Sequence, residues 1–266
     1  MNALETLTRL ADERPLVHHL TNYVTVNLVA NVTLCTGALP VMAHAVEEVE
    51  EMAAVASALV INMGTLDPAW IEAMIRAGKE ANRRDIPVVF DPVGAGATSF
   101  RTSMPEKLLS EIDFAAIVGN AGEIATLAGM QAEVRGVESL GGDARTAVVK
   151  AARLLGATVA ATGPTDYASD GEKLLAIDNG HPLMGRIVGS GCASTAAVGC
   201  FAAAGGAGIE TVAGALAYFG HAGELAAGKA DGPGTFEPRF LDALAALAGE
   251  PDALEGNLKI KEEDVG

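Results

Sequence analysis

Cysteine, aromatic residues and basic residues are all scarce in this chain of 266 residues. Three cysteines, at positions 35, 192 and 200, are too few for a disulfide framework and lack the paired spacing of a zinc site. We therefore expect free thiols and a cytoplasmic protein. Lys and Arg number 18 against 34 Asp and Glu, a formal net charge of −16. This balance argues against binding to nucleic acid or to an anionic membrane, because both attract basic surfaces.

We expect neither a secretory signal nor a membrane span. The first 14 residues of the chain mix acidic with apolar residues instead of placing a basic segment before an apolar one. The most apolar stretch, residues 192–209, is rich in Ala and Gly and is predicted to be too weakly apolar to cross a membrane. Hydrophobic residues still make up 50% of the chain, enough for a sizeable core.

Short apolar runs alternate with longer helical patterns, which predicts an α/β fold with a mostly parallel sheet. We predict strands at 15–20, 40–42, 58–62, 87–91, 114–118, 158–161 and 173–178, the last antiparallel or at an edge. We predict helices at 24–36, 46–56, 67–84, 190–204, 210–230 and 236–248. Residues 1–254 should form a single domain, and the charged tail 255–266 should be frayed.

Polar residues follow several predicted strands, where ligands bind in parallel sheets. Asp91 is followed by small residues up to Thr98, which favours either a capped turn or a close approach to a ligand. The stretch is neither a P-loop nor a dinucleotide fingerprint, because the required lysine and third glycine are missing. Asn120 and Glu123 have the spacing of a helix capping box, and Glu123 could equally hold a hydrated Mg²⁺. The residues from Thr162 to Asp166 indicate only a turn.

The strongest local signal is Gly189-Ser190-Gly191-Cys192, directly before a predicted helix. Glycines at a helix start expose backbone N–H groups to an anion, and the helix dipole adds to the attraction. Cys192 lies in the first helical turn, where the pKa of a thiol can fall below its usual value of about 8.5. Cys192 is therefore either a small buried residue or a catalytic thiol. The five histidines lack the spacing of a helical metal pair, so we predict structural or substrate-lining roles for them.

Taken together and in order, these motifs resemble those of the hydroxyethylthiazole kinase family, a group of ribokinase-like enzymes of thiamine salvage. The resemblance extends from about Pro15 to Leu247. It is carried by His19-Leu20-Thr21-Asn22-Tyr23-Val24 with Asn27 and Asn31, by residues 40–43, 61–66, 91–98 and 119–124, by Thr162-Gly163, Asp166 and Asp170-Gly171, and by residues 189–192. It implies a ribokinase-like three-layer α/β/α fold without a separate lid domain.

The resemblance also implies an activity and its site. Family members phosphorylate the primary hydroxyl of 5-(2-hydroxyethyl)-4-methylthiazole with ATP and Mg²⁺, as homotrimers with sites between subunits. By position, the substrate would be lined by Asn22, Met42 and Gly189, and Mg²⁺ would be held by Asp91 and Glu123. Asn120, Thr162 and position 118 would lie at the nucleotide. Gly189, Ser190, Gly191 and Cys192 would form the anion hole, with Cys192 where most ribokinase-like sugar kinases carry an aspartate base.

Two departures and three alternatives accompany this resemblance. Val188, before Gly189, stands where the family often has Thr, and we expect little effect from it. Val118 replaces a residue that is usually basic in the family, which removes one nucleotide contact or moves it elsewhere. One alternative is a kinase for another small alcohol, such as hydroxymethylpyrimidine. A second is a cysteine-dependent hydrolase or acyltransferase that uses Cys192 with His18, His19 or His221 as the base. The third is a thiazole-binding trimer without catalytic activity.

Overall fold

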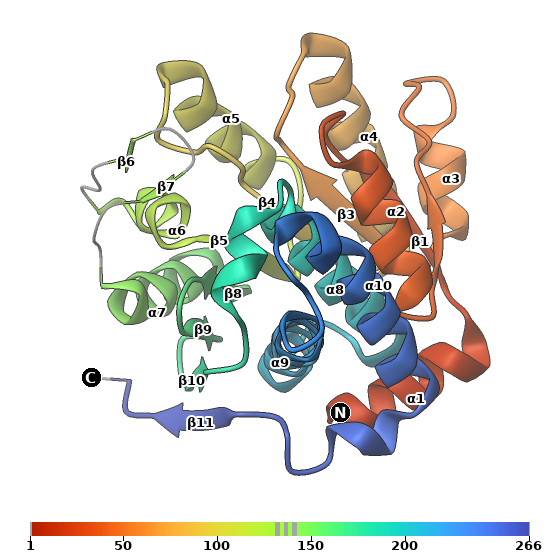
Figure 1. The fold of residues 1–266 in the computed structure, drawn as a ribbon. Coiled ribbons are helices and arrows are strands. Elements are labelled where there is room, and N and C mark those ends of the chain that lie inside the picture. The colour runs from red at the N-terminus through yellow and green to blue at the C-terminus, as the bar shows by residue number, and fades with distance from the viewer. Residues whose placement is uncertain (1, 131–133, 136–137, 140–142, 266) are drawn as a thin grey trace.

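In the computed structural model, described over residues 2–130, 134–135, 138–139 and 143–265, one large sheet is covered by helices on both faces (Figure 1). The strand order is β11-β10-β9-β8-β5-β4-β3-β1-β2. Strands β2, β1, β3, β4, β5 and β8 are parallel, and β9, β10 and β11 are each antiparallel to the strand before them. The predicted α/β class with a mostly parallel sheet is confirmed.

The strands of this sheet are β1 (Leu16–Leu20), β2 (Leu39–Val41), β3 (Ala58–Asn62), β4 (Val88–Asp91), β5 (Ala116–Asn120), β8 (Thr158–Thr162), β9 (Asp166–Ser169), β10 (Leu174–Ile177) and β11 (Ile260–Glu263). The helices are α1 (Ala3–Glu13), α2 (Val26–Cys35), α3 (Val49–Val55), α4 (Pro68–Arg83), α5 (Ser99–Leu109), α6 (Ala121–Leu127), α7 (Ala144–Leu155), α8 (Ser190–Gly205), α9 (Ile209–Ala227) and α10 (Pro233–Gly249). Short 3-10 helices span Pro182–Arg186 and Pro251–Leu254, and β6 (Val134–Arg135) pairs with β7 (Glu138–Ser139) as a separate hairpin.

The core consists of two apolar layers, one on each face of the sheet. On β3, Val60 faces the layer formed with α1, α2, α8, α9 and α10, whereas Leu59 and Ile61 face the layer formed with α3 to α7. Strands buried on both faces are apolar throughout, which is why their runs are continuous in the sequence. A Cβ on Gly199 would lie 2.3 Å from Val60 Cγ2, so only glycine lets α8 approach β3 this closely. This close packing sets how near α8 lies to β3.

Several elements were not predicted from the sequence, among them α1, α5, α7 and β9. Helix α1 carries a local signal, because Asn2 and Glu5 form a capping box and Leu7 and Leu10 are fully buried. Strand β9 begins at Asp166, where only a turn was predicted, and it pairs antiparallel with β8. Four-residue strands of this kind depend on their neighbours, so the sequence alone does not predict them reliably.

The prediction of a frayed tail at residues 255–266 is wrong, because this segment contains β11, the outermost strand on one side of the sheet. Ile260–Glu263 pairs antiparallel with β10, which is therefore not an edge strand. Two ion pairs hold this segment. Lys261 Nζ lies 3.1 Å from Asp178 Oδ2, and Lys259 Nζ lies 2.8 Å from Glu224 Oε1. Charged side chains are common on edge strands, where they oppose aggregation, so the polar composition of this segment is compatible with a strand.

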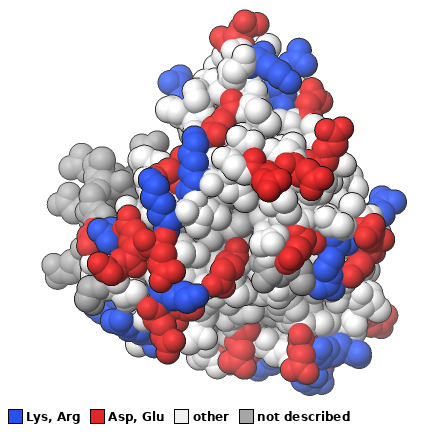
Figure 2. All heavy atoms as spheres, turned by 90° about the horizontal axis from the view of Figure 1, so that it is seen from below, with Lys and Arg blue, Asp and Glu red and all other residues white. Residues whose placement is uncertain are grey.

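Charges of both signs are mixed on the face of the molecule that is seen from below (Figure 2). Acidic and basic side chains lie close to one another there and do not gather into a basic field, which a polyanion would require. Among the residues that the structure describes, no helix is long and apolar enough to cross a membrane.

Candidate active site

The carboxyl ends of the parallel strands bring the predicted polar residues side by side. In the register of the sheet, Asn62 at the end of β3 lies beside Asp91 at the end of β4. Asn120 and Thr162, the last residues of β5 and β8, form a second such pair. Asn22 follows β1, which is the next strand beyond β3. The sheet therefore collects residues from five strands at one edge, where α/β proteins bind ligands.

Two buried carboxylates, Asp91 and Glu123, form the centre of this edge. Asp91 Oδ2 accepts hydrogen bonds from Asn62 Nδ2 at 2.7 Å and Thr195 Oγ1 at 3.1 Å. Glu123 accepts backbone N–H groups on both oxygens, from Gly94 at 2.7 Å and from Asn120 at 2.7 Å. Both side chains are therefore held in place by the strand-end loops.

Burial raises the pKa of both carboxyl groups. The pKa of Asp91 lies well above its ordinary value, first because of burial and then because of the neighbouring charge of Glu123. Burial likewise raises the pKa of Glu123, against its two backbone hydrogen bonds and the positive charge of Arg101. Two adjacent carboxylates without a bound cation repel each other, and a divalent cation removes this cost. Within the described residues no three acidic, histidine or cysteine side chains could hold a metal together.

Asn120 and Glu123 form the predicted capping box at the start of α6. Asn120 Oδ1 accepts the N–H of Glu123 at 3.0 Å, and the carboxylate of Glu123 returns to the N–H of Asn120. The capping role is confirmed, and it orients Glu123 toward the loop after β4 instead of competing with a ligand role. Thr162 Oγ1 donates to the carbonyl of Gly119 at 3.3 Å, so it remains half-buried beside Asn120.

Helix α8 begins at Ser190, as predicted, with Gly189 as its N-cap. Gly189 has a φ of +88°, and a Cβ there would lie 2.4 Å from Thr25 Cγ2, so glycine is required both for conformation and for space. The N-cap glycine has no side chain with which to cap this helix. The first N–H groups of α8 are therefore available to an anion, which the helix dipole attracts.

Cys192 lies half-buried in the first turn of α8, and Asn22 Nδ2 donates to its Sγ at 3.4 Å. The prediction of a lowered thiol pKa is wrong. Burial, followed by the negative charge of Asp91, raises the pKa of Cys192 to about 11. The helix start favours the thiolate, but the desolvation of a charge in this environment outweighs it. At neutral pH Cys192 is therefore a thiol.

Asn22 and Met42, predicted at the substrate, are linked by His44. The N–H of Thr21 donates to His44 Nε2 at 3.2 Å, so His44 Nδ1 must carry the proton and donate to the carbonyl of Met42 at 2.9 Å. The ring of His44 packs on Trp70, with 4.2 Å between ring centroids. The hydrogen bonds of His44 thus connect the loop after β1 with the loop after β2, beside Asn22.

The other histidines fit the structural role predicted for them. His18 and His19 are fully buried, and burial lowers the pKa of His18 to about 4 and that of His19 to about 3. His221 is buried beside Glu224, with 3.0 Å between His221 Nδ1 and Glu224 Oε2.

Val118 was predicted at the nucleotide, but its side chain is fully buried in the core layer with α8 and α9. Its side chain therefore cannot contact a nucleotide. Its place along the strand explains this: Val118 lies in the middle of β5, which is buried on both faces, whereas the ligand edge begins at the last residue of the strand, Asn120. Asp166, which accepts the N–H of Gly163 at 2.8 Å, has its pKa raised to about 7 by burial.

Two residues at this edge were missed as site residues. Asn62 lies between Asn22 and Asp91 and is hydrogen-bonded to both. Arg101, from α5, donates to the carbonyls of Met63 at 3.0 Å, Val93 at 2.8 Å and Gly64. Asn62 ends a predicted strand just as Asp91 does, and that position was its available signal. No comparable local signal marks Arg101, because only the tertiary fold places it beside the loops after β3 and β4.

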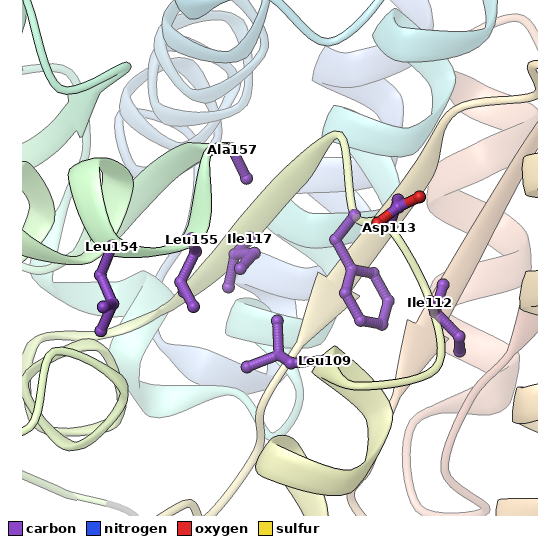
Figure 3. Close-up of a pocket in the computed structure, with 8 residues that line it drawn as sticks. Leu109, Ile112, Asp113, Ile117, Leu154, Leu155 and Ala157 are labelled. Carbon is purple, nitrogen blue, oxygen red and sulfur yellow. The ribbon is translucent and has the colours of Figure 1, made fainter.

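A hollow lies at the opposite end of the sheet and contains none of the predicted site residues. It has a volume of about 190 Å³ and lies between the C-terminal ends of α5 and α7 (Figure 3). Its lining is apolar apart from Asp113: Leu109, Ile112, Phe114, Ile117, Leu154, Leu155 and Ala157. Because parallel α/β sheets bind ligands at the carboxyl ends of their strands, the candidate site is the edge described above.

The sheet and its two helical layers have a ribokinase-like fold. A ribokinase-like superfamily protein from Enterococcus faecalis superimposes with a TM-score of 0.63 over 88% of this chain and 86% of that chain. At 14% identity this similarity shows the fold alone.

The chain belongs to the hydroxyethylthiazole kinase family, whose model matches residues 7–250. The hydroxyethylthiazole kinase of Rubrobacter xylanophilus is 65% identical over the full length of both chains. The solved structure of the hydroxyethylthiazole kinase protein from Pyrococcus horikoshii superimposes with a TM-score of 0.89 at 40% identity, covering 98% of this chain and 99% of that one. The family suggested by the motifs and the predicted ribokinase-like fold are confirmed.

Proposed function

We propose that this protein transfers the γ-phosphoryl group of ATP to the primary hydroxyl of 5-(2-hydroxyethyl)-4-methylthiazole. The bond between the γ-phosphorus and the bridging oxygen of ADP breaks, a bond to the alcohol oxygen forms, and the hydroxyl proton passes to water or to an oxygen of the transferred phosphoryl group. The observation that carries the proposal is the meeting of Asn22, Asp91 and the uncapped start of α8 at one edge of the sheet. Family membership supports the choice of alcohol.

Asp91 and Glu123 would hold Mg²⁺. Both carboxylates are buried at the same strand ends. Burial raises both pKa values, and the charge of Glu123 raises that of Asp91 further, so a divalent cation would offset the cost of ionising them. Mg²⁺ needs only one or two protein carboxylates, because waters and phosphate oxygens complete its coordination. When bound, the cation would supply positive charge against the triphosphate.

The backbone N–H groups of Gly189, Ser190 and Gly191 and of Cys192 would hold the transferring phosphoryl group. Phosphoryl transfer has a loose transition state, so positioning and charge stabilisation contribute most of the rate. Removing one comparable donor in another enzyme costs about 10²–10³ in rate. Asn120 and Thr162, on the neighbouring strands, would contact the nucleotide phosphates.

Cys192 would contact the alcohol oxygen rather than remove its proton early. A thiol with a pKa of about 11 is protonated at neutral pH and is a poor base. In a loose transition state the alcohol proton becomes acidic only as the oxygen bonds to phosphorus, so it can leave late. Met42, with the loop that His44 holds, would line the thiazole ring together with Asn22 and Gly189.

The functional assembly would be a homotrimer with sites between subunits, acting in the cytoplasm. Tyr23, Val24 and Val188 are 64%, 69% and 75% exposed and adjoin the pocket residues Asn22 and Gly189. Apolar side chains this exposed around a polar site support coverage by another subunit. Light scattering tests the assembly, and a monomeric mass would contradict it.

The three free cysteines support a location in the cytoplasm, where thiols stay reduced.

The experiment that tests the activity measures ADP release from Mg-ATP with and without the thiazole alcohol. We expect turnover that requires the alcohol and disappears when EDTA removes the divalent cation. Alcohol-dependent stabilisation against heat without ADP release would instead favour a binding protein. Absence of both effects would contradict the proposed substrate.

A further inference from the structure

A row of hydrogen-bonded side chains crosses the site from Cys192 to Asp91. Asn22 Nδ2 donates to Cys192 Sγ at 3.4 Å and to Asn62 Oδ1 at 2.9 Å. Asn62 Nδ2 donates in turn to Asp91 Oδ2 at 2.7 Å. The row joins the loop after β1, the end of β3, the end of β4 and the first turn of α8. Residues proposed for the alcohol and residues proposed for the cation are thus connected through Asn62.

The direction of every bond in this row is determined by the backbone. Asn22 Oδ1 accepts the N–H groups of Val24 and Thr25, both at 3.1 Å, so its amide nitrogen must point toward Asn62. Asn62 Oδ1 accepts the N–H of Gly64 at 3.0 Å, so its amide nitrogen must point toward Asp91. Because a backbone N–H only donates, neither amide can be reversed without opposing donors.

The row is also rigid because it is buried and tightly packed. Asn22, Asn62 and Asp91 are 4%, 2% and 4% exposed. A Cβ on Gly64 would lie 2.6 Å from Asn22 Cβ, which shows how closely the two loops approach each other. Buried polar groups with all their hydrogen bonds satisfied hold a single arrangement, because breaking one bond leaves an unpaired group out of water.

Asn62 also decides which oxygen of Asp91 is available. Both side-chain hydrogen bonds to this carboxylate, from Asn62 and Thr195, end on Oδ2. In the part of the chain that the structure describes, Oδ1 receives no side-chain hydrogen bond. Two donors on one oxygen fix the plane of the carboxylate and leave the other oxygen free for a ligand.

We propose that Asn62 is a positioning residue that couples the alcohol side of the site to the cation side. It holds Asn22 through its oxygen and Asp91 through its nitrogen, so one side chain sets the geometry of both partners of the transfer. This inference rests on the proposed function, because it assigns the alcohol to Asn22 and the cation to Asp91.

The test compares Asn62→Ala with Thr195→Val, because each removes one donor from the same oxygen of Asp91. Both variants should raise the KM for Mg-ATP and lower kcat. Only Asn62→Ala should also weaken the alcohol side, raising the KM for the alcohol about 5- to 10-fold, the effect of one lost hydrogen bond. Calorimetric titration with the alcohol in EDTA, without nucleotide, should show the same weakening for Asn62→Ala and none for Thr195→Val.

Asn82→Ala is the matched control. Asn82 likewise uses both ends of its amide: its nitrogen donates to the carbonyl of Asp113 and its oxygen accepts the N–H of Asp113, both at 2.8 Å, at the opposite end of the sheet. It should leave both KM values and alcohol binding unchanged. If Asn62→Ala does not fold, Asn62→Ser replaces it, because the shorter hydroxyl cannot reach both Asn22 and Asp91.

The possible results separate this inference from the proposed function. A wild-type protein that neither binds nor phosphorylates the alcohol overturns the proposed function. An active wild type whose Asn62→Ala variant binds the alcohol in EDTA as tightly as Thr195→Val overturns the coupling role. The same holds if Asn62→Ala lowers activity only in proportion to its folded fraction, with both KM values unchanged.

Discussion

At the scale of single residues, the environment of a side chain decides its chemistry more than its position in a motif. Cys192 lies at a helix start, yet burial and Asp91 raise its pKa to about 11. Val118 lies in a nucleotide motif, yet its side chain is fully buried in the core. Residue type and spacing identified both residues, but the desolvation of Cys192 and the burial of Val118 inside the sheet depend on the folded chain, and these determine what the two residues can do.

Cys192 provides a prediction at this scale. Cys192→Ala should lower kcat by no more than about 10²-fold, the low end of the contribution of a positioned acid or base, because the thiol is a poor base. Cys192→Asp should remain active, because a carboxylate can accept the late proton. Steady-state ADP release measures both variants. A completely inactive Cys192→Asp with intact folding and ATP binding would contradict this role.

At the scale of elements, the beginning of α8 depends on packing around glycine. Gly199 lets the helix lie directly against β3, and Gly189 turns the chain into the helix at a φ of +88° beside Thr25. Gly189 and Gly191 are recognisable in the sequence by their position before an apolar helix. That Thr25, far away in the sequence, sets the space available to Gly189 follows only from the fold.

Gly189→Ala should therefore reduce kcat strongly, by about 10²–10³-fold, because the new methyl group displaces the first turn of α8 from the transferring phosphoryl group. Gly208→Ala is the control. Gly208 also caps a helix, its φ is −68°, and no described atom outside its own chain neighbours lies within 4 Å of the place that a Cβ would take. Steady-state rates with both substrates saturating, alongside circular dichroism, distinguish the two variants. Equal activity of both would contradict the role of the α8 start.

At the scale of the whole molecule, two buried acids make stability depend on pH and on cations. The pKa values of Asp91 and Glu123 are raised in the folded protein above their ordinary values of 3.8 and 4.5. The folded state therefore binds more protons than the unfolded state. The contribution of these groups to stability is present at low pH and is lost as pH rises from about 4 through the raised pKa values.

Asp91→Asn should therefore flatten this part of the pH profile. In EDTA the variant should unfold at a higher temperature than the wild type at pH 8, because it removes one of two repelling carboxylates. MgCl₂ should raise the unfolding temperature of the wild type more than that of Asp91→Asn. Thermal unfolding followed by circular dichroism measures both effects. A variant less stable than the wild type at pH 8, with an unchanged pH profile, would contradict the electrostatic account.

The sequence by itself determined the alternation of strands and helices, the parallel sheet and the polar strand ends. These follow from local periodicity and from strands buried on both faces, which leave a continuous apolar signal. Asn22, Asp91, Asn120 and Thr162 could therefore be placed at or just after strand ends from the local pattern alone. The capping box of α6 was equally local, because its two residues are three positions apart.

Only the tertiary structure decided how these ends meet and what they become there. The row from Cys192 through Asn22 and Asn62 to Asp91 joins residues up to 170 positions apart. Likewise, β11 became a strand because β10 was available as its partner. Hydrogen bonds, desolvation and strand pairing between distant segments depend on where the chain returns, and local patterns in a sequence do not carry that information.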